Sequence, residues 1–182
     1  MGIPEGAPAP QLWPVSAARR SAEAGIDALY REHGLGLVRF ALLLTGDKGS
    51  AEDVVQDAFL GLYRGWDRIR LDGNELAYLR ASVMNGSRSV HRARFRARQH
   101  EPAAEPPVWS AEAAAIDGED RRELLAAVAA LPTHQREVLV LKFFLDLPEA
   151  EVAQIMRVSR GTVSSRAARA LSALARRLKE ER

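Results

Sequence analysis

Apolar residues recur every three or four positions along most of this chain, which is the spacing of amphipathic helices. No run alternates apolar and polar residues between turn signals, so we expect no strand. The pattern falls into two helical parts, residues 23–98 and 117–182, separated by a proline-containing acidic linker at 99–116. Residues 1–22 are rich in Pro, Gly and Ala and are predicted to form a disordered leader. The sequence therefore predicts an all-α fold of two small helical domains joined by a flexible linker.

Three helices are predicted in the first part, and short signals mark their ends. Gly46 supplies a C-terminal stop for the first helix, and Gly34 and Gly36 favour a break within it. The stretch Ser50–Asp53 matches a capping box and predicts the start of the second helix. Asn74 is a favourable N-cap for the third helix.

The second part is predicted to hold a helix that Pro132 ends, followed by a strongly apolar segment over Thr133–Leu145 that we expect to be buried on most sides. Residues Pro148–Arg169 then have the pattern of a helix-turn-helix, with Val158 and Val163 as the apolar residues that fix the helix crossing and Ser159 as the cap of the second helix. Its outward face is expected to present short polar side chains and arginines: Arg160, Thr162, Ser164, Ser165, Arg166 and Arg169. This composition suits the reading of base edges in a major groove. An ordinary helical hairpin gives a similar apolar pattern, but the absence of acids from the outward face favours DNA.

The distribution of charge supports the same interpretation. The net charge is only +2, but three of the 26 Lys and Arg residues are lysines and the rest are arginines. The stretches Arg80–Arg98 and Arg157–Lys179 contain no acid, and acids cluster between them. Two basic blocks on either side of an acidic spacer indicate two contacts with a polyanion. A GC-rich genome would explain the Arg-to-Lys ratio, but it would not remove acids from two long helical stretches.

Several classes of function have no support in the sequence. The chain has no cysteine, and its four histidines lack metal-ligand spacing, so neither a metal nor a cofactor is expected. Its apolar runs are too short to span a bilayer and its first residues lack a secretion signal, which predicts a cytoplasmic protein without membrane contact. No phosphate loop or nucleophile–base pair appears, so we expect no catalytic residue.

Two sets of motifs in this order resemble one family. The stretches Gln135–Leu139, Leu147–Ala153 and Val158–Arg166 resemble region four of bacterial extracytoplasmic-function sigma factors. Ala51–Phe59 is similar to the core-polymerase-binding helix of their region two, and Tyr78–Asn85 resembles the start of their promoter-opening helix, in particular that of the sigma-E-like actinobacterial subgroup.

The resemblance implies a promoter-specificity subunit of RNA polymerase and gives each motif a role. One set of residues would bind the clamp of the largest polymerase subunit: Asp53, Gln56, Asp57 and Leu60. A second would hold the single-stranded minus-ten element: Arg80, Asn85, Arg88, His91, Arg92 and Arg94. The helix-turn-helix would read the duplex minus-thirty-five element through Ser159 and the outward face given above, while its domain contacts the flap of the second-largest subunit. An anti-sigma factor as a further partner stays open, as does a plain solvated helix start for Asp53.

Three residues depart from the family pattern. Arg157 stands in the turn where the family usually has glycine, Pro148 replaces a serine-type cap, and Gly86 interrupts the third helix. Because glycine adopts a left-handed turn at little cost, we expect Arg157 to strain this turn or to change its geometry. The competing hypothesis is a stand-alone helix-turn-helix regulator whose first domain dimerises or binds a ligand, and such a protein would not need a single-strand-binding helix.

Overall fold

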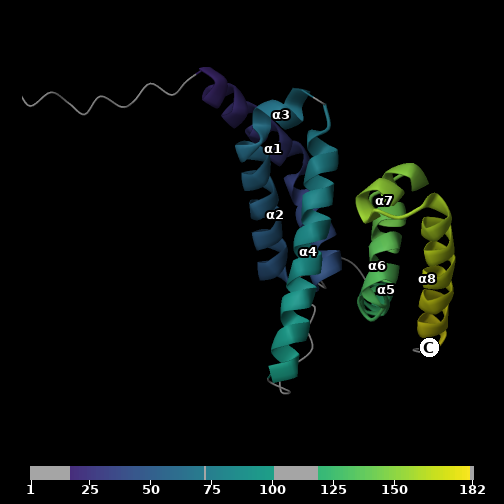
Figure 1. The fold of residues 1–182 in the computed structure, drawn as a ribbon. Coiled ribbons are helices and arrows are strands. Elements are labelled where there is room, and N and C mark those ends of the chain that lie inside the picture. Colours follow the sequence, from purple (N-terminus) through teal and green to yellow (C-terminus); the bar gives the residue numbers. More distant parts are fainter. Residues whose placement is uncertain (1–16, 72, 101–118, 181–182) are drawn as a thin grey trace, which may run out of the picture.

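The computed structural model describes residues 17–71, 73–100 and 119–180, and all regular structure in these ranges is helical, which confirms the predicted all-α fold (Figure 1). The first group contains α1 (Ala17–Thr45), α2 (Lys48–Arg64), α3 (Trp66–Leu71) and α4 (Glu75–His100). The second group contains α5 (Glu119–Ala129), α6 (Thr133–Leu139), the π-helix η1 (Val140–Phe144), α7 (Glu149–Met156) and α8 (Arg160–Glu180). Among these elements, none combines the length and apolarity that a bilayer crossing requires.

The first helix differs from the expectation at both of its predicted irregularities. It runs without a break through Gly34 and Gly36, because Leu37 and Phe40, just beyond, are buried in the core and hold the segment helical. It also begins at Ala17, so the part of the predicted leader that follows this residue is helical. The rest of the leader, and residues 101–116 of the predicted linker, lie outside the described residues.

The start of α2 also differs from the prediction. The N-cap is Asp47, whose carboxylate accepts a hydrogen bond of 2.8 Å from the backbone N–H of Ser50. The capping box at Ser50–Asp53 is therefore wrong, because the Asp47 carboxylate already satisfies the first free N–H groups of the helix. The predicted stop at Gly46 is confirmed, since this residue adopts a positive φ of 82° directly after α1.

The apolar segment after Pro132 is only partly buried. It changes from α-helix to π-helix at Val140, and Leu145 N–H donates to the carbonyl of Val140 five residues earlier. The wider turn rotates the following side chains off the buried face. Phe143 and Phe144 are consequently 54% and 43% exposed, so the expectation that they are buried is wrong.

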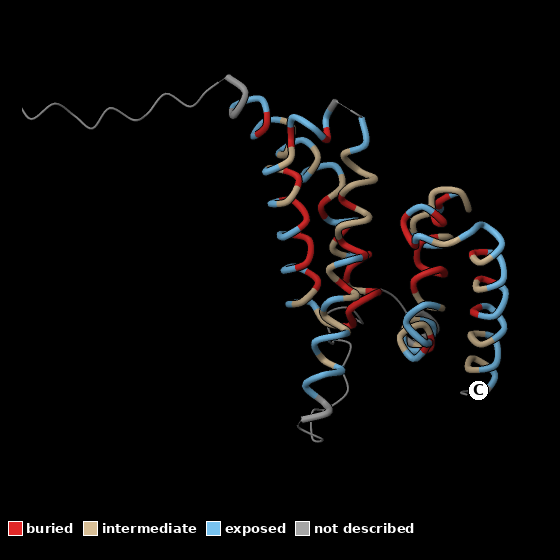
Figure 2. The backbone as a smooth tube through the Cα atoms, in the orientation of Figure 1, coloured by how far each residue is buried: buried red, intermediate tan, exposed pale blue. Residues whose placement is uncertain are grey.

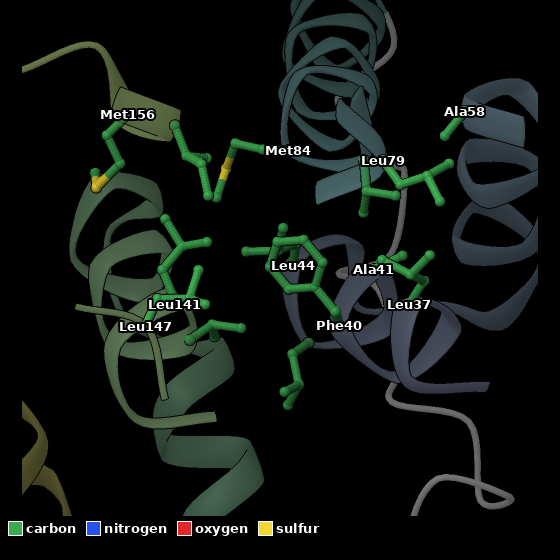
Figure 3. Packing of buried hydrophobic residues seen from close by; sticks show 14 of the residues in the cluster. Leu37, Phe40, Ala41, Leu44, Ala58, Leu79, Met84, Leu141, Leu147 and Met156 are labelled. Carbon is green, nitrogen blue, oxygen red and sulfur yellow. The ribbon is translucent and has the colours of Figure 1, made fainter. Parts of the chain in front are cut away.

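The two groups of helices pack against each other. Figure 2 shows buried residues on the facing sides of both groups and exposed residues along the lower half of α4 and the outer side of α8. One continuous apolar cluster contains Phe40, Leu44 and Met84 from the first group together with Leu141 and Met156 from the second. In Figure 3 the side chains of Met84, Leu44 and Leu141 lie toward one another, and Met156 lies further from the first group. The chain thus has two helical groups, and part of its core lies between them.

Candidate nucleic-acid interface

The helix-turn-helix forms as the sequence predicts. Ser159 caps α8, and its Oγ accepts a hydrogen bond of 3.1 Å from the backbone N–H of Thr162. Val163 and Ala167 are buried where α8 packs on α6 and α7. Arg157 ends α7 in the left-handed conformation, with φ 56° and ψ 49°. This arginine therefore adopts the conformation for which glycine is favoured, so the helix crossing keeps its geometry while the turn stores backbone strain.

The expected outward face of α8 is largely accessible to solvent. Arg160, Ser164, Ser165 and Arg169 are exposed, and Thr162 and Arg166 are half-buried. Leu171, which the spacing of Val163 and Ala167 would place toward the core, is 45% exposed. It directly follows the buried Ala170 and is rotated from it by about 100° around the helix, so it falls on the boundary of the buried stripe that Val163 and Ala170 define.

An acid from α7 lies beside this face, and sequence reasoning missed it. Glu149 accepts hydrogen bonds from Lys142 Nζ at 2.5 Å and from Ser164 Oγ at 3.1 Å. The Lys142 hydrogen bond holds the pKa of the Glu149 carboxyl below its ordinary value. Ser164 is thereby tied to α7, which orients the start of the recognition helix relative to its neighbour. Local periodicity carries no signal for this contact, because the two residues are 15 positions apart.

The predicted single-strand-binding residues of α4 divide into two sets. Asn85 and Arg92 are exposed, and the Phe95 ring beside them is 65% exposed. The remaining residues are half-buried and bonded within the molecule: Arg80, Arg88, His91 and Arg94. Tyr78, an aromatic ring near the start of the same helix, packs against the core near Gly61, so Phe95 is the more accessible of these two rings.

The bonded arginines of α4 find their partners on other helices. Arg88 donates to both carboxylate oxygens of Glu137 at 2.7 and 2.8 Å, and Arg80 donates to Glu151 at 2.8 Å. The hydrogen bond to Glu137 raises the pKa of the Arg88 guanidinium, so this arginine carries its positive charge at neutral pH. Arg94 donates to the Asp47 carboxylate, which also caps α2.

His91 lies at the junction of the two groups. Its Nε2 is 2.7 Å from the carbonyl oxygen of Leu44, and because a carbonyl only accepts, Nε2 carries the proton. Burial lowers the pKa of this histidine, the Leu44 contact opposes that effect, and the nearby charges of Arg136 and Arg94 lower it further. His91 is therefore neutral at pH 7 and acts here as a structural donor.

The expected polymerase-binding edge of α2 is exposed. Asp53, Gln56 and Asp57 lie on the solvent side, and Leu60 is 51% exposed. On the opposite side of the same helix Phe59 is buried and its ring meets that of Tyr30 edge-on at 5.3 Å. The edge thus combines two carboxylates and an amide with accessible apolar surface, a mixture that suits a protein contact.

The geometry defines a helical protein with two arginine-rich helices, one of which is the second helix of a helix-turn-helix. The family model "Sigma-70 region 2" matches residues 29–99, and the model "Sigma-70, region 4" matches residues 121–174. The chain is 33% identical over 176 residues to the ECF RNA polymerase sigma factor SigL of Mycobacterium tuberculosis, covering 91% of this chain and 96% of the relative. It is 32% identical over 145 residues to the RNA polymerase sigma-E factor of Streptomyces avermitilis, covering 80% and 78%.

A solved structure agrees with these similarities. The sigma factor RpoE from Bartonella quintana, crystallised with the anti-sigma factor NepR, is 26% identical and superposes with a TM-score of 0.72 over 85% of this chain and 99% of that one. The chain therefore belongs to the extracytoplasmic-function sigma factors of the sigma-70 family. As such it binds RNA polymerase and directs transcription initiation at promoters.

Proposed function

We propose that α8 reads the duplex minus-thirty-five element from the major groove. The support is the exposed face that carries Arg160, Ser165 and Arg169 on the side of α8 away from α6. Arginine forks contact guanine edges and phosphates, and the short hydroxyl side chains leave room for close approach. The capped N-terminus at Ser159 would point backbone N–H groups at a phosphate.

We propose that α4 holds the opened minus-ten strand. Its exposed residues supply the groups that this task requires: Phe95 can stack on a base, Asn85 can both donate to and accept from a base edge, and Arg92 can bind a phosphate. Because only an unstacked strand fits such a surface, binding would favour the melted promoter over the duplex. The chain would thus open DNA as a non-enzymatic initiation factor, and the nucleotide chemistry would belong to the polymerase.

We propose that the exposed edge of α2 docks on the clamp of the largest polymerase subunit. Asp53, Gln56 and Asp57 would give orientation and fast association, and Leu60 would add apolar contact. The exposed Phe143 and Phe144 in the second group offer a further apolar contact for the flap of the second-largest subunit. An anti-sigma partner is a natural addition, since the related Bartonella protein was crystallised with one.

The proposal that α8 reads promoter DNA rests on one observation, the exposed arginine face of a capped recognition helix. The test measures binding of promoter duplex by the purified chain with and without core polymerase. Tight, sequence-specific binding should require the core, and Arg169→Ala should weaken it about tenfold, the cost of one lost arginine contact of about 1–3 kcal/mol.

The matched control is Arg176→Ala, which removes an exposed arginine further along the same helix. It should leave promoter binding unchanged. Equal losses for both variants would show that the start of α8 is not the segment that reads DNA, because Arg169 and Arg176 lie on the same side of the helix. Tight specific binding by the free chain as a dimer would favour the stand-alone regulator instead.

A further inference from the structure

The interface between the two helical groups is built on charge as well as on apolar contact. Two carboxylates of the second group reach arginines of α4: Glu137 of α6 binds Arg88, and Glu151 of α7 binds Arg80. The Glu137 side chain is only 5% exposed, and the side chains of Arg88 and Arg80 are 25% and 21% exposed. Both pairs are therefore largely withdrawn from water.

Two further contacts fasten the same interface. Arg136 of α6 donates at 2.9 Å to the Leu44 carbonyl near the end of α1 and at 2.6 Å to the Ala129 carbonyl at the end of α5. One guanidinium thus bonds terminal carbonyls from both groups, and the Leu44 carbonyl accepts a second hydrogen bond from His91. Met84 of α4 is fully buried and faces Leu141 of the second group (Figure 3). Particular residues therefore hold the two helical groups together, and this packed arrangement is called closed below.

Glu137 binds Arg88 with the same two-bond geometry that a phosphate group would use. Both oxygens of the carboxylate accept from Nε and Nη2, which is the two-bond fork that guanidinium groups also make with phosphate. Arg80 and Arg88 are two of the residues that the resemblance assigns to the minus-ten strand. As long as the two glutamates occupy them, a DNA strand cannot use them.

We propose that Glu137 and Glu151 act as internal phosphate mimics, so that the closed chain masks its own single-strand-binding helix until the two groups separate. This inference rests on the proposed role of α4. Asn85, Arg92 and Phe95 remain exposed in the closed arrangement. An incoming strand can therefore bind these residues first and then displace the two glutamate carboxylates from the arginines.

The interface also has a side on which it is loosely packed. A cavity of about 990 Å³ lies between the lower part of α4 and the helices α5 and α6, and its lining includes Arg92, Phe95 and Ala130. This cavity opens to solvent, so the two groups do not pack closely against each other here. The groups are therefore in tight contact near Met84 and loosely apposed near Phe95, and an interface of this kind separates at less cost than a continuous core.

The experiment uses the full chain and two fluorophores, one on each group. The chain has no cysteine, so Arg64→Cys on α2 and Ser172→Cys on α8, both at exposed positions, give unique labelling sites. Energy transfer between them reports the closed state. Titration with an unlabelled single-stranded oligonucleotide should lower the energy transfer. The affinity of the chain for the oligonucleotide is measured separately by fluorescence anisotropy.

Glu137→Gln and Glu151→Gln keep the shape of each side chain and remove the charge that mimics phosphate. We expect each variant to lower energy transfer and to tighten oligonucleotide binding, by about tenfold for the double variant, because the binding-competent fraction rises. Asp67→Asn on α3 is the control, since it makes the same change of charge at an exposed position outside the interface. The glutamine variants should no longer bind the oligonucleotide more tightly than the parent chain once core polymerase is bound. Glu151→Gln, at a partly exposed site, keeps the test valid if Glu137→Gln folds poorly.

Two outcomes would overturn the masking proposal: unchanged energy transfer in both glutamine variants, or lower transfer with an affinity equal to that of Asp67→Asn. A separate measurement tests the role of α4 itself. If Arg92→Ala weakens oligonucleotide binding by the polymerase-bound protein, α4 is the strand-binding helix, whether or not the masking proposal holds. If Arg92→Ala has no effect there, the proposed function of α4 fails.

Discussion

The two basic helices, α4 and α8, are alike in sequence and different in their surroundings. Each carries several arginines and no acid over a long stretch. In α8 the outward arginines Arg160 and Arg169 are exposed. In α4, by contrast, Arg80 and Arg88 are paired with carboxylates of the other group. A stretch without acids therefore predicts a basic face, but it does not predict whether that face is free or occupied.

The largest effect on stability is expected from removing Arg88, the arginine that is paired with Glu137. Arg88→Ala leaves the carboxylate of Glu137 buried without its cation, so the free energy of unfolding should fall by about 2–3 kcal/mol, somewhat below the cost of breaking a fully buried pair. The melting temperature, measured by circular dichroism, should fall by about 4–12 °C. Arg169→Ala, at an exposed site on α8, should leave it unchanged. Equal melting temperatures for both variants would contradict the contrast between the helices.

A second contrast lies in the glycines of the two helices. A Cβ on Gly86 of α4 would come within 2.8 Å of Cγ1 of Val54, whereas a Cβ on Gly161 of α8 would meet nothing closer than 3.9 Å. Gly86 thus lets α4 pack closely on α2, which is the physical reason for its departure from the family pattern. Gly86→Ala should destabilise the fold by about 1 kcal/mol, because crowding of about 1–3 kcal/mol exceeds the gain in helix propensity. Urea denaturation of Gly86→Ala and of the control Gly161→Ala decides the point, and a more stable Gly86→Ala protein would refute the packing role.

The turn before α8 should respond in the opposite direction. Arg157 has a positive φ of 56°, a conformation that costs a side-chain-bearing residue about 1–2 kcal/mol. Arg157→Gly relieves this strain but makes the unfolded chain more flexible, so we expect a net stabilisation of less than about 1 kcal/mol. Promoter affinity of the holoenzyme should stay within twofold. A loss of stability in thermal melting would show that the arginine side chain contributes contacts that outweigh the strain.

The smallest effect is a pH dependence at the junction of the groups. The pKa of His91 is lowered in the folded protein, so below the ordinary value of about 6.5 the unfolded chain takes up a proton that the folded chain does not. Stability should therefore fall as the pH decreases from 7.5 to 5.5. His91→Gln, which can still donate to Leu44, should show a shallower decrease in melting temperature, and His134→Gln, at an exposed site, should match the parent. A slope unchanged by His91→Gln would exclude this histidine as the cause.

The recognition helix could be predicted from the sequence because its determinants are local. The cap Ser159, the apolar residue Val163 and the exposed Arg169 are all confirmed, and each depends on spacings of at most a few residues. The continuity of α1 could not be predicted, since the burial of Leu37 and Phe40 outweighs the weak propensity of the glycines before them.

The occupied state of α4 was beyond local reasoning for a related cause. Glu137 is 49 residues from Arg88, and Glu151 is 71 residues from Arg80. Nothing in the spacing of charges on either helix indicates that these residues meet. The cap of α2 was missed for a simpler reason, because Asp47 and Ser50 both carry side chains that suit an N-cap and only the geometry separates them.

The central claim is that α4 and α8 act on different parts of one promoter. Permanganate reactivity of the minus-ten thymines, measured together with promoter binding for the Asn85→Ala and Arg169→Ala holoenzymes, tests it most directly. The account predicts that Asn85→Ala lowers reactivity more than binding, and that Arg169→Ala lowers binding while the complexes that do form still open. Parallel losses of binding and reactivity in both variants would contradict it.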